Sequence, residues 1–206
     1  PEDCDMAHDI TLYGVDFARS ARCRWTLREL DLPFEEINDG SLIGGEVLRA
    51  VHPQAKVPAI VIDGEPLFES SAICTYLCDL TPHKQLVAAP GTRARALHDQ
   101  WVSFAQSEIE GYLWSNAKHL SFYPEEKRIP AVIERNNEEI SSGLAVLNEV
   151  LGKSGYLIDD RFSVTDIIVG WTANWARRQG RLDGFDHLGA YVQRLLAREL
   201  CPFNPA

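Results

Sequence analysis

The residues best suited to bind a ligand lie in KVPAIVIDGEPLFESSAI, residues 56–73. Proline has no N–H for a sheet ladder, so the backbone of Val57, next to Pro58, is expected to pair with an extended peptide instead. Glu69 and Ser70 follow where a helix is predicted to begin. Ser70 and the first helical N–H groups suit a carboxylate, and Glu69 suits an ammonium group.

A carboxylate and an ammonium group on one carbon define an α-amino acid. Lys56 adds a cation on the other side of the Val57 backbone, where it suits a second carboxylate. The segment therefore predicts a site for a small peptide that carries an α-amino acid at one end and a carboxylate at the other.

The elements that position this segment follow from hydrophobic periodicity and turn residues. The predicted strands are residues 10–15, 34–37, 57–62 and 66–68, the last two joined at Asp63-Gly64. The predicted helices begin at Ser20 as an N-cap, near Leu42 and at Glu69. The order β-α-β-α-β-β-α predicts a small mixed sheet layered with helices, over residues 9–80.

Proline, glycine and weak periodicity predict a linker at residues 81–91, and everything beyond it reads as an all-helical domain, residues 92–206. Trp101, Phe104, Ile109 and Tyr112 give one long helix an apolar side, and residues 133–151 give a second helix another. These two helices are expected to pack as a hairpin. Ser163 and Asp166 have the spacing of an N-terminal capping box before a buried helix, and residues 187–200 form a last helix.

Composition limits the partners. With 30 acidic against 20 basic residues the net charge is −10, which argues against a nucleic acid or an anionic membrane as partner. No long apolar run or signal-like start is seen, so a cytoplasmic protein is expected.

The five cysteines include no CxxC pair and indicate reduced thiols, with burial expected for Cys74 and Cys78. The six histidines lack ligand spacing, so we expect no metal.

The segment resembles the glutathione-binding half of cytosolic glutathione transferases. Their pattern of Val-Pro, hairpin, Glu-Ser and Ala-Ile appears at Val57-Pro58, Asp63-Gly64, Glu69-Ser70 and Ala72-Ile73, and LYG (12–14), RCRWTLRELDLPFE (22–35) and SVTDI (163–167) look similar too. The resemblance implies a thioredoxin-like domain followed by an all-helical domain, a homodimer, and glutathione as co-substrate. By position, Lys56 would meet the glycyl carboxylate, Val57 the cysteinyl backbone, and Glu69 and Ser70 the γ-glutamyl end.

The group that activates the glutathione thiol is the point where the match fails. Many members of the family place a Ser or Cys where this chain has Phe17 or Ala18, and neither side chain can donate a hydrogen bond. Ser20 is our first substitute, at the expected helix N-cap. Tyr13 is the second, because one subgroup uses a tyrosine at the end of the first strand, and Arg19 could add positive charge beside the thiolate.

A small hydrophobic electrophile is the expected second substrate, with Phe17, Tyr112 and Trp114 as candidates for an aromatic wall. We therefore predict a glutathione transferase. A glutathione-dependent lyase or isomerase is one alternative, and a non-catalytic family member that carries a ligand or binds a partner is another. The sequence does not choose among conjugation, dehalogenation, ether cleavage, isomerisation and peroxide reduction.

Overall fold

The computed structural model describes residues 8–203, and its N-terminal part is built on a four-stranded sheet. The strands are β1 (Ile10–Gly14), β2 (Glu35–Asn38), β3 (Ala59–Ile62) and β4 (Glu65–Phe68), in the order β2-β1-β3-β4. β1 runs parallel to β2 and antiparallel to β3, and β3 pairs with β4 as an antiparallel hairpin. Ile10 and Leu12 are buried while Thr11 and Tyr13 are half-buried, as the two-residue period of a strand requires.

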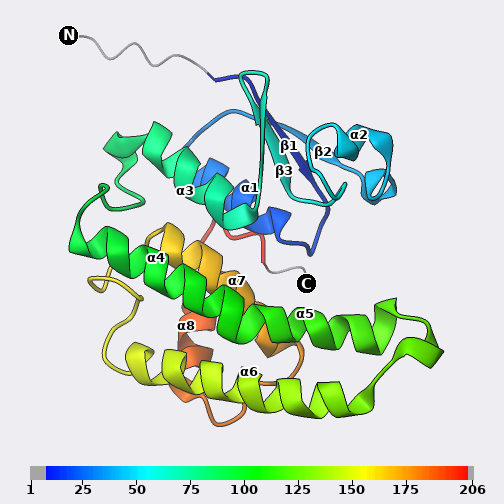
Figure 1. The fold of residues 1–206 in the computed structure, drawn as a ribbon. Coiled ribbons are helices and arrows are strands. Elements are labelled where there is room, and N and C mark those ends of the chain that lie inside the picture. The colour runs from blue at the N-terminus through cyan, green and yellow to red at the C-terminus, as the bar shows by residue number, and fades with distance from the viewer. Residues whose placement is uncertain (1–7, 204–206) are drawn as a thin grey trace. The chain divides into compact units, whose positions relative to one another are not determined.

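Three helices accompany this sheet: α1 (Ser20–Glu29), α2 (Glu46–Arg49) and α3 (Ser70–Leu80). α1 and α3 pack side by side on the sheet, and α2 lies apart from them beside β2 (Figure 1). Trp25 and Leu27 of α1 and Ile73 and Leu77 of α3 are fully buried in this packing. The predicted order β-α-β-α-β-β-α is confirmed.

Two local predictions in this part are wrong. The helix expected over residues 42–51 is only the short α2, because Gly44 has a φ of +85° and the chain must turn before the helix can begin. Ser20 is not the N-cap of α1 but its first helical residue. The N-cap is Arg19, which makes no side-chain capping hydrogen bond.

The chain divides between Val87 and Ala88, inside the predicted linker. The first compact unit, here the N-terminal unit, also includes the segment that starts at Glu199, which the sequence analysis had assigned to the helical domain. Phe203 of that segment is buried and meets the ring of Trp25 edge-on, with ring centroids 4.8 Å apart. The N-terminal unit thus takes part of its core from the other end of the chain.

The second compact unit, here the helical unit, spans residues 88–198. Its helices are α4 (Arg93–Ala105), α5 (Gly111–Ala117), α6 (Pro130–Leu151), α7 (Val164–Arg178) and α8 (Asp186–Leu196), and π-helical segments lie at Gln106–Glu110 and Lys118–Phe122. α4 and α5 follow one line in Figure 1, and α6 packs against α5, which confirms the predicted hairpin. Within the long helical line, Val102, Ile109 and Leu113 are buried, whereas Trp101 and Phe104 are only half-buried.

The capping box predicted at the start of α7 is confirmed. The Asp166 carboxylate accepts hydrogen bonds from the N–H of Ser163 at 2.9 Å and of Leu157 at 3.1 Å, and from the hydroxyl of Tyr191 at 3.1 Å. Burial nevertheless raises the pKa of Asp166 to about 6, because its neutral form costs less to bury.

Candidate functional site

Two of the predicted binding residues, the acidic Glu69 and the hydroxyl-bearing Ser70, lie at the start of α3. Glu69 is the N-cap of this helix, is exposed, and has φ 72° and ψ 111°. A left-handed φ is unfavourable for a residue with a Cβ, and such strain is most often kept at functional sites. Ser70 is the first helical residue and is 2% exposed. The geometry therefore presents a carboxylate to solvent beside a sheltered hydroxyl and a helix N-terminus.

A residue that the sequence analysis did not assign lies beneath Ser70. Arg22 of α1 is fully buried, and its Nη1 donates a hydrogen bond to Ser70 Oγ at 3.2 Å. Because that oxygen accepts from Arg22, the Ser70 hydroxyl proton is directed to another acceptor, and the cation makes the site more favourable for a carboxylate. Arg22 lies three residues before the buried Trp25, on the same helix face, and this spacing indicates burial of the arginine but does not identify its partner.

The Val57–Pro58 bond is cis. The pairing of β3 with β1 and β4 begins only at Ala59, so Val57, which was predicted to be the first residue of this strand, lies just before the sheet ladder. Lys56 is exposed, and its Nζ donates to Gln54 Oε1 at 2.6 Å. The structure thus places a lysine with a fixed partner directly before the backbone that was expected to bind a peptide.

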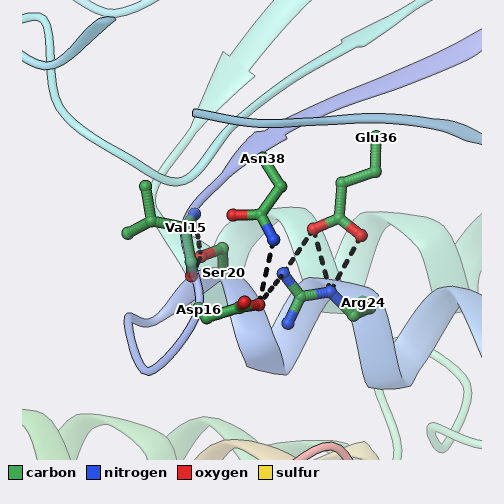
Figure 2. A network of polar contacts seen from close by, with 6 residues as sticks. All are labelled: Val15, Asp16, Ser20, Arg24, Glu36 and Asn38. Atoms are coloured by element: carbon green, nitrogen blue, oxygen red, sulfur yellow. Dashed lines mark hydrogen bonds and ion pairs between the residues drawn. The ribbon is translucent and has the colours of Figure 1, made fainter. Parts of the chain in front are cut away.

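The loop between β1 and α1 is closed by Ser20. Its hydroxyl donates to the carbonyl oxygen of Val15 at 2.8 Å and accepts from the Val15 N–H at 3.1 Å, as Figure 2 shows. Ser20 is fully buried, and its Cβ lies so close to Gly14 that a Cβ on this glycine would come within 2.8 Å. The hydroxyl proton that thiol activation would need is therefore already used within the loop.

The same loop is tied to the sheet by charged side chains (Figure 2). Arg24 of α1 is 6% exposed and donates from Nε to both carboxylate oxygens of Glu36, at 2.8 and 2.9 Å. Asp16 lies 3.5 Å from Arg24 and accepts from Asn38 Nδ2 at 3.0 Å. Burial alone would lower the pKa of Arg24, but its bonds to Glu36 outweigh burial and raise it. The loop is thus held by β2 and α1 together.

The remaining predicted residues have these positions. Tyr13 near the end of β1 and Arg19 at the start of α1 are half-buried. Phe17 is 60% exposed, with a φ of 62°. Tyr112 and Trp114 are half-buried on α5 in the helical unit, where Trp114 contacts the ring of Phe122 at a centroid distance of 5.2 Å. Tyr13, Arg19 and Phe17 therefore belong to one short stretch of the N-terminal unit.

Three of the four described cysteines are buried, and Cys201 is half-buried. Cys23, Cys74 and Cys78 are buried and form no disulfide within residues 8–203, which confirms the burial expected for the latter two, while Cys4 lies outside the described residues. Burial raises the pKa of the Cys23 thiol, so it stays protonated at neutral pH. Among residues 8–203, no group of three or more His, Cys, Asp or Glu side chains is arranged to hold a metal ion, and no helix is long and apolar enough to cross a membrane.

Two models of one protein family match the two parts of the chain separately. The model of the glutathione S-transferase N-terminal domain matches residues 12–85, and that of the C-terminal domain matches residues 130–194. Glutathione S-transferase GstB of Escherichia coli strain K12 is 30% identical over 167 residues, which cover 78% of this chain and 79% of the relative. The chain belongs to the glutathione S-transferase family.

Two further members of the glutathione S-transferase family match nearly the whole chain. Glutathione S-transferase GstA of Escherichia coli O157:H7 is 28% identical over 208 residues, covering 96% of this chain and 90% of the relative. The crystal structure of glutathione transferase URE2P6 from Phanerochaete chrysosporium, in complex with oxidised glutathione, has a TM-score of 0.84 at 26% identity and covers 94% and 93% of the two chains. The predicted fold class, a thioredoxin-like domain followed by an all-helical one, is confirmed.

Proposed function

We propose that this protein is a glutathione transferase that binds glutathione in its N-terminal unit and activates the thiol for attack on a small hydrophobic electrophile. The γ-glutamyl end would lie at Glu69 and Ser70, the cysteinyl backbone would pair with Val57, and Lys56 would hold the glycyl carboxylate. The complex of URE2P6 with oxidised glutathione supports the ligand class. No metal is required in this scheme.

One observation carries the binding proposal: an exposed Glu69 in a strained left-handed conformation stands next to the buried Ser70 that Arg22 polarises. A plain helix cap does not need such strain, since an extended backbone caps a helix at lower cost. An ammonium group bound by Glu69 and a carboxylate bound at Ser70 would use both features together.

For the thiol activator, the geometry changes our order of preference. Both hydrogen-bonding functions of Ser20 are used by Val15, so its hydroxyl would have to leave the loop before it could reach a sulfur atom. We therefore propose Tyr13 as the hydroxyl donor and Arg19 as an additional cation. Phe17 and Tyr112 remain our proposal for the contacts with the electrophile.

The reaction class is tested by following both glutathione and an aromatic electrophile such as 1-chloro-2,4-dinitrobenzene. Formation of a thioether with release of chloride and a proton, and with equal loss of glutathione and of the chloroarene, is the result expected of a transferase. Turnover of an isomerisable or cleavable substrate with no net loss of glutathione would instead identify a lyase or isomerase. Binding without any turnover would identify a non-catalytic carrier or interaction protein.

The resemblance is also the basis for proposing a homodimeric, cytoplasmic enzyme with a role in detoxification. Sedimentation equilibrium would give twice the chain mass of 23.1 kDa if the homodimer is formed. A mass of one chain at micromolar concentration would contradict it.

A further inference from the structure

The turn that precedes the Val57–Pro58 bond is closed by a histidine. The N–H of Ala55 donates to the carbonyl oxygen of His52 at 2.8 Å, and the N–H of Gln54 donates to His52 Nδ1 at 3.0 Å. Ala55 has a φ of 49°, a left-handed conformation that costs an alanine about 1–2 kcal/mol. The side-chain bond from His52 thus supports a turn whose own backbone is unfavourable.

This turn delivers the lysine of the proposed site. Gln54, whose backbone is held by His52, accepts at its side-chain Oε1 the hydrogen bond from Lys56 Nζ at 2.6 Å. A lysine side chain has several freely rotating bonds, so an isolated exposed lysine spreads over many positions. The chain of contacts from His52 through Gln54 restricts where the ammonium group of Lys56 lies.

The imidazole also contacts the strand that leads to Glu69. His52 is 7% exposed, and its ring packs against Phe68, the residue before Glu69, at a centroid distance of 4.8 Å. Burial lowers the pKa of His52, the charge of Glu69 opposes this, and the charge of Lys56 adds to it. At neutral pH the ring is therefore neutral, and Nδ1 is free of a proton so that it can accept from Gln54.

We propose that His52 is a positioning residue for the glycyl end of glutathione, acting through Gln54 to hold Lys56 where it meets the glycyl carboxylate. This inference rests on the proposed function, since it needs glutathione as the ligand. It assigns His52 no direct contact with the thiol. Its signature is a loss of affinity confined to ligands that carry the glycyl carboxylate.

Isothermal titration of wild type, His52→Phe and His52→Asn tests this assignment, with glutathione and with γ-glutamylcysteine, which lacks the glycine. Phenylalanine keeps a ring against Phe68 but has no acceptor. Asparagine lacks the ring but can accept from the N–H two residues on, as in an Asx turn. We expect the Kd for glutathione to rise about tenfold in His52→Phe and to stay within about threefold of wild type in His52→Asn.

The truncated ligand separates positioning from general damage. γ-Glutamylcysteine lacks the glycyl carboxylate, and its terminal carboxylate lies on cysteine, one residue short of the position assigned to Lys56. For this ligand we therefore expect the same Kd in wild type and His52→Phe. Equal weakening of both ligands in His52→Phe would overturn the inference, as would unchanged binding of glutathione. If wild type binds neither ligand, the proposed function fails and this inference fails with it, so the two failures are distinguishable.

A pH series gives a second readout that a merely structural role would not move. Protonation puts a hydrogen on Nδ1 and removes the acceptor for Gln54, so the affinity of wild type for glutathione should fall relative to that of His52→Asn as the pH drops below 6.5. Glu69 and Lys56 are present in both proteins, so their effects cancel in the ratio of the two Kd values. A ratio independent of pH between 7.5 and 5 would overturn the inference.

Discussion

The hydroxyl groups of the β1–α1 loop have different tasks at the scale of single residues. The Ser20 hydroxyl bonds to both backbone groups of Val15, whereas Tyr13 is a half-buried side chain near the end of β1. We expect Ser20→Ala to lower the free energy of unfolding by about 1–3 kcal/mol, because Val15 loses two partners. Urea denaturation measures this change.

Thiol activation is expected to depend on Tyr13 and not on Ser20. In the glutathione complex, ultraviolet thiolate absorbance at neutral pH should persist in Ser20→Ala and disappear in Tyr13→Phe, which removes the proposed donor. Tyr76→Phe, at an exposed tyrosine of α3, is the matched control. Thiolate lost in Ser20→Ala but kept in Tyr13→Phe would restore Ser20 as the activator.

Which site residues the sequence could reveal depends on how far apart their partners lie. Lys56, Val57, Glu69 and Ser70 follow one another along a single hairpin, so chain order alone brings them near one another. The role of Arg22 depends on Ser70, which lies 48 residues later, and no local pattern states that contact. The hydrogen bonds between Ser20 and Val15 could not be predicted for another reason. A serine at a helix start looks the same in the sequence whether its hydroxyl caps the helix, closes a loop or binds a ligand.

At the scale of elements, the turn before β3 contains one strained residue, Ala55, whose strain a substitution can relieve. Ala55 has a φ of 49°, and glycine adopts this conformation without a Cβ penalty. Ala55→Gly is expected to raise the free energy of unfolding by about 0.5–1 kcal/mol, the relief of strain less the greater entropy of unfolded glycine. Chemical denaturation of the two proteins side by side provides the measurement. A loss of stability would mean that the turn is not strained at this residue.

The start of α7 should respond to pH. Since burial raises the pKa of Asp166 to about 6, the folded protein binds this proton more tightly than the unfolded chain, whose aspartates titrate near 3.9. The stability that the neutral carboxyl gives is present below pH 4 and is lost as the pH rises through 6. The total loss is about 3 kcal/mol.

Asp166→Asn cannot titrate and supplies the comparison. Its amide disturbs the capping box at every pH, but the difference in unfolding free energy between it and wild type should shift by up to about 3 kcal/mol in favour of the variant between pH 4 and 7. Urea titrations at each pH give this difference. A difference that stays constant over the range would show that the pKa of Asp166 is not raised.

Elements were predictable where a pattern is local and strong. The alternation in ITLYG and the Asp63-Gly64 hairpin gave β1, β3 and β4, and the Ser163–Asp166 spacing gave the capping box. The helix expected near Leu42 failed because Gly44 interrupts it. Along the line of α4 and α5, apolar spacing selected half-buried aromatic residues such as Trp101, because the π-helical segment Gln106–Glu110 shifts the faces of the helix.

For the whole molecule, the sequence predicted two domains but not the return of the chain to the first one. Phe203 packs edge-on against Trp25, which lies 178 residues earlier in the chain (203 − 25), and both side chains are buried. Phe203→Ala should destabilise the N-terminal unit by about 3 kcal/mol or more, because it opens a cavity beside Trp25. Hydrogen exchange of the α1 amides would report this loss, and unchanged α1 protection would contradict the packing described here.

The most direct test of the central claim is an isothermal titration of glutathione into wild type and Ser70→Ala, with Ser71→Ala as the neighbouring control. Ser71 donates to no ligand in the proposed scheme, whereas Ser70 joins Arg22 to the γ-glutamyl carboxylate. We expect the wild type and the Ser71 variant to bind with similar Kd values and the Ser70 variant to bind at least tenfold more weakly. Equal binding by all three proteins would contradict the assigned site, and no binding by the wild type would contradict the function itself.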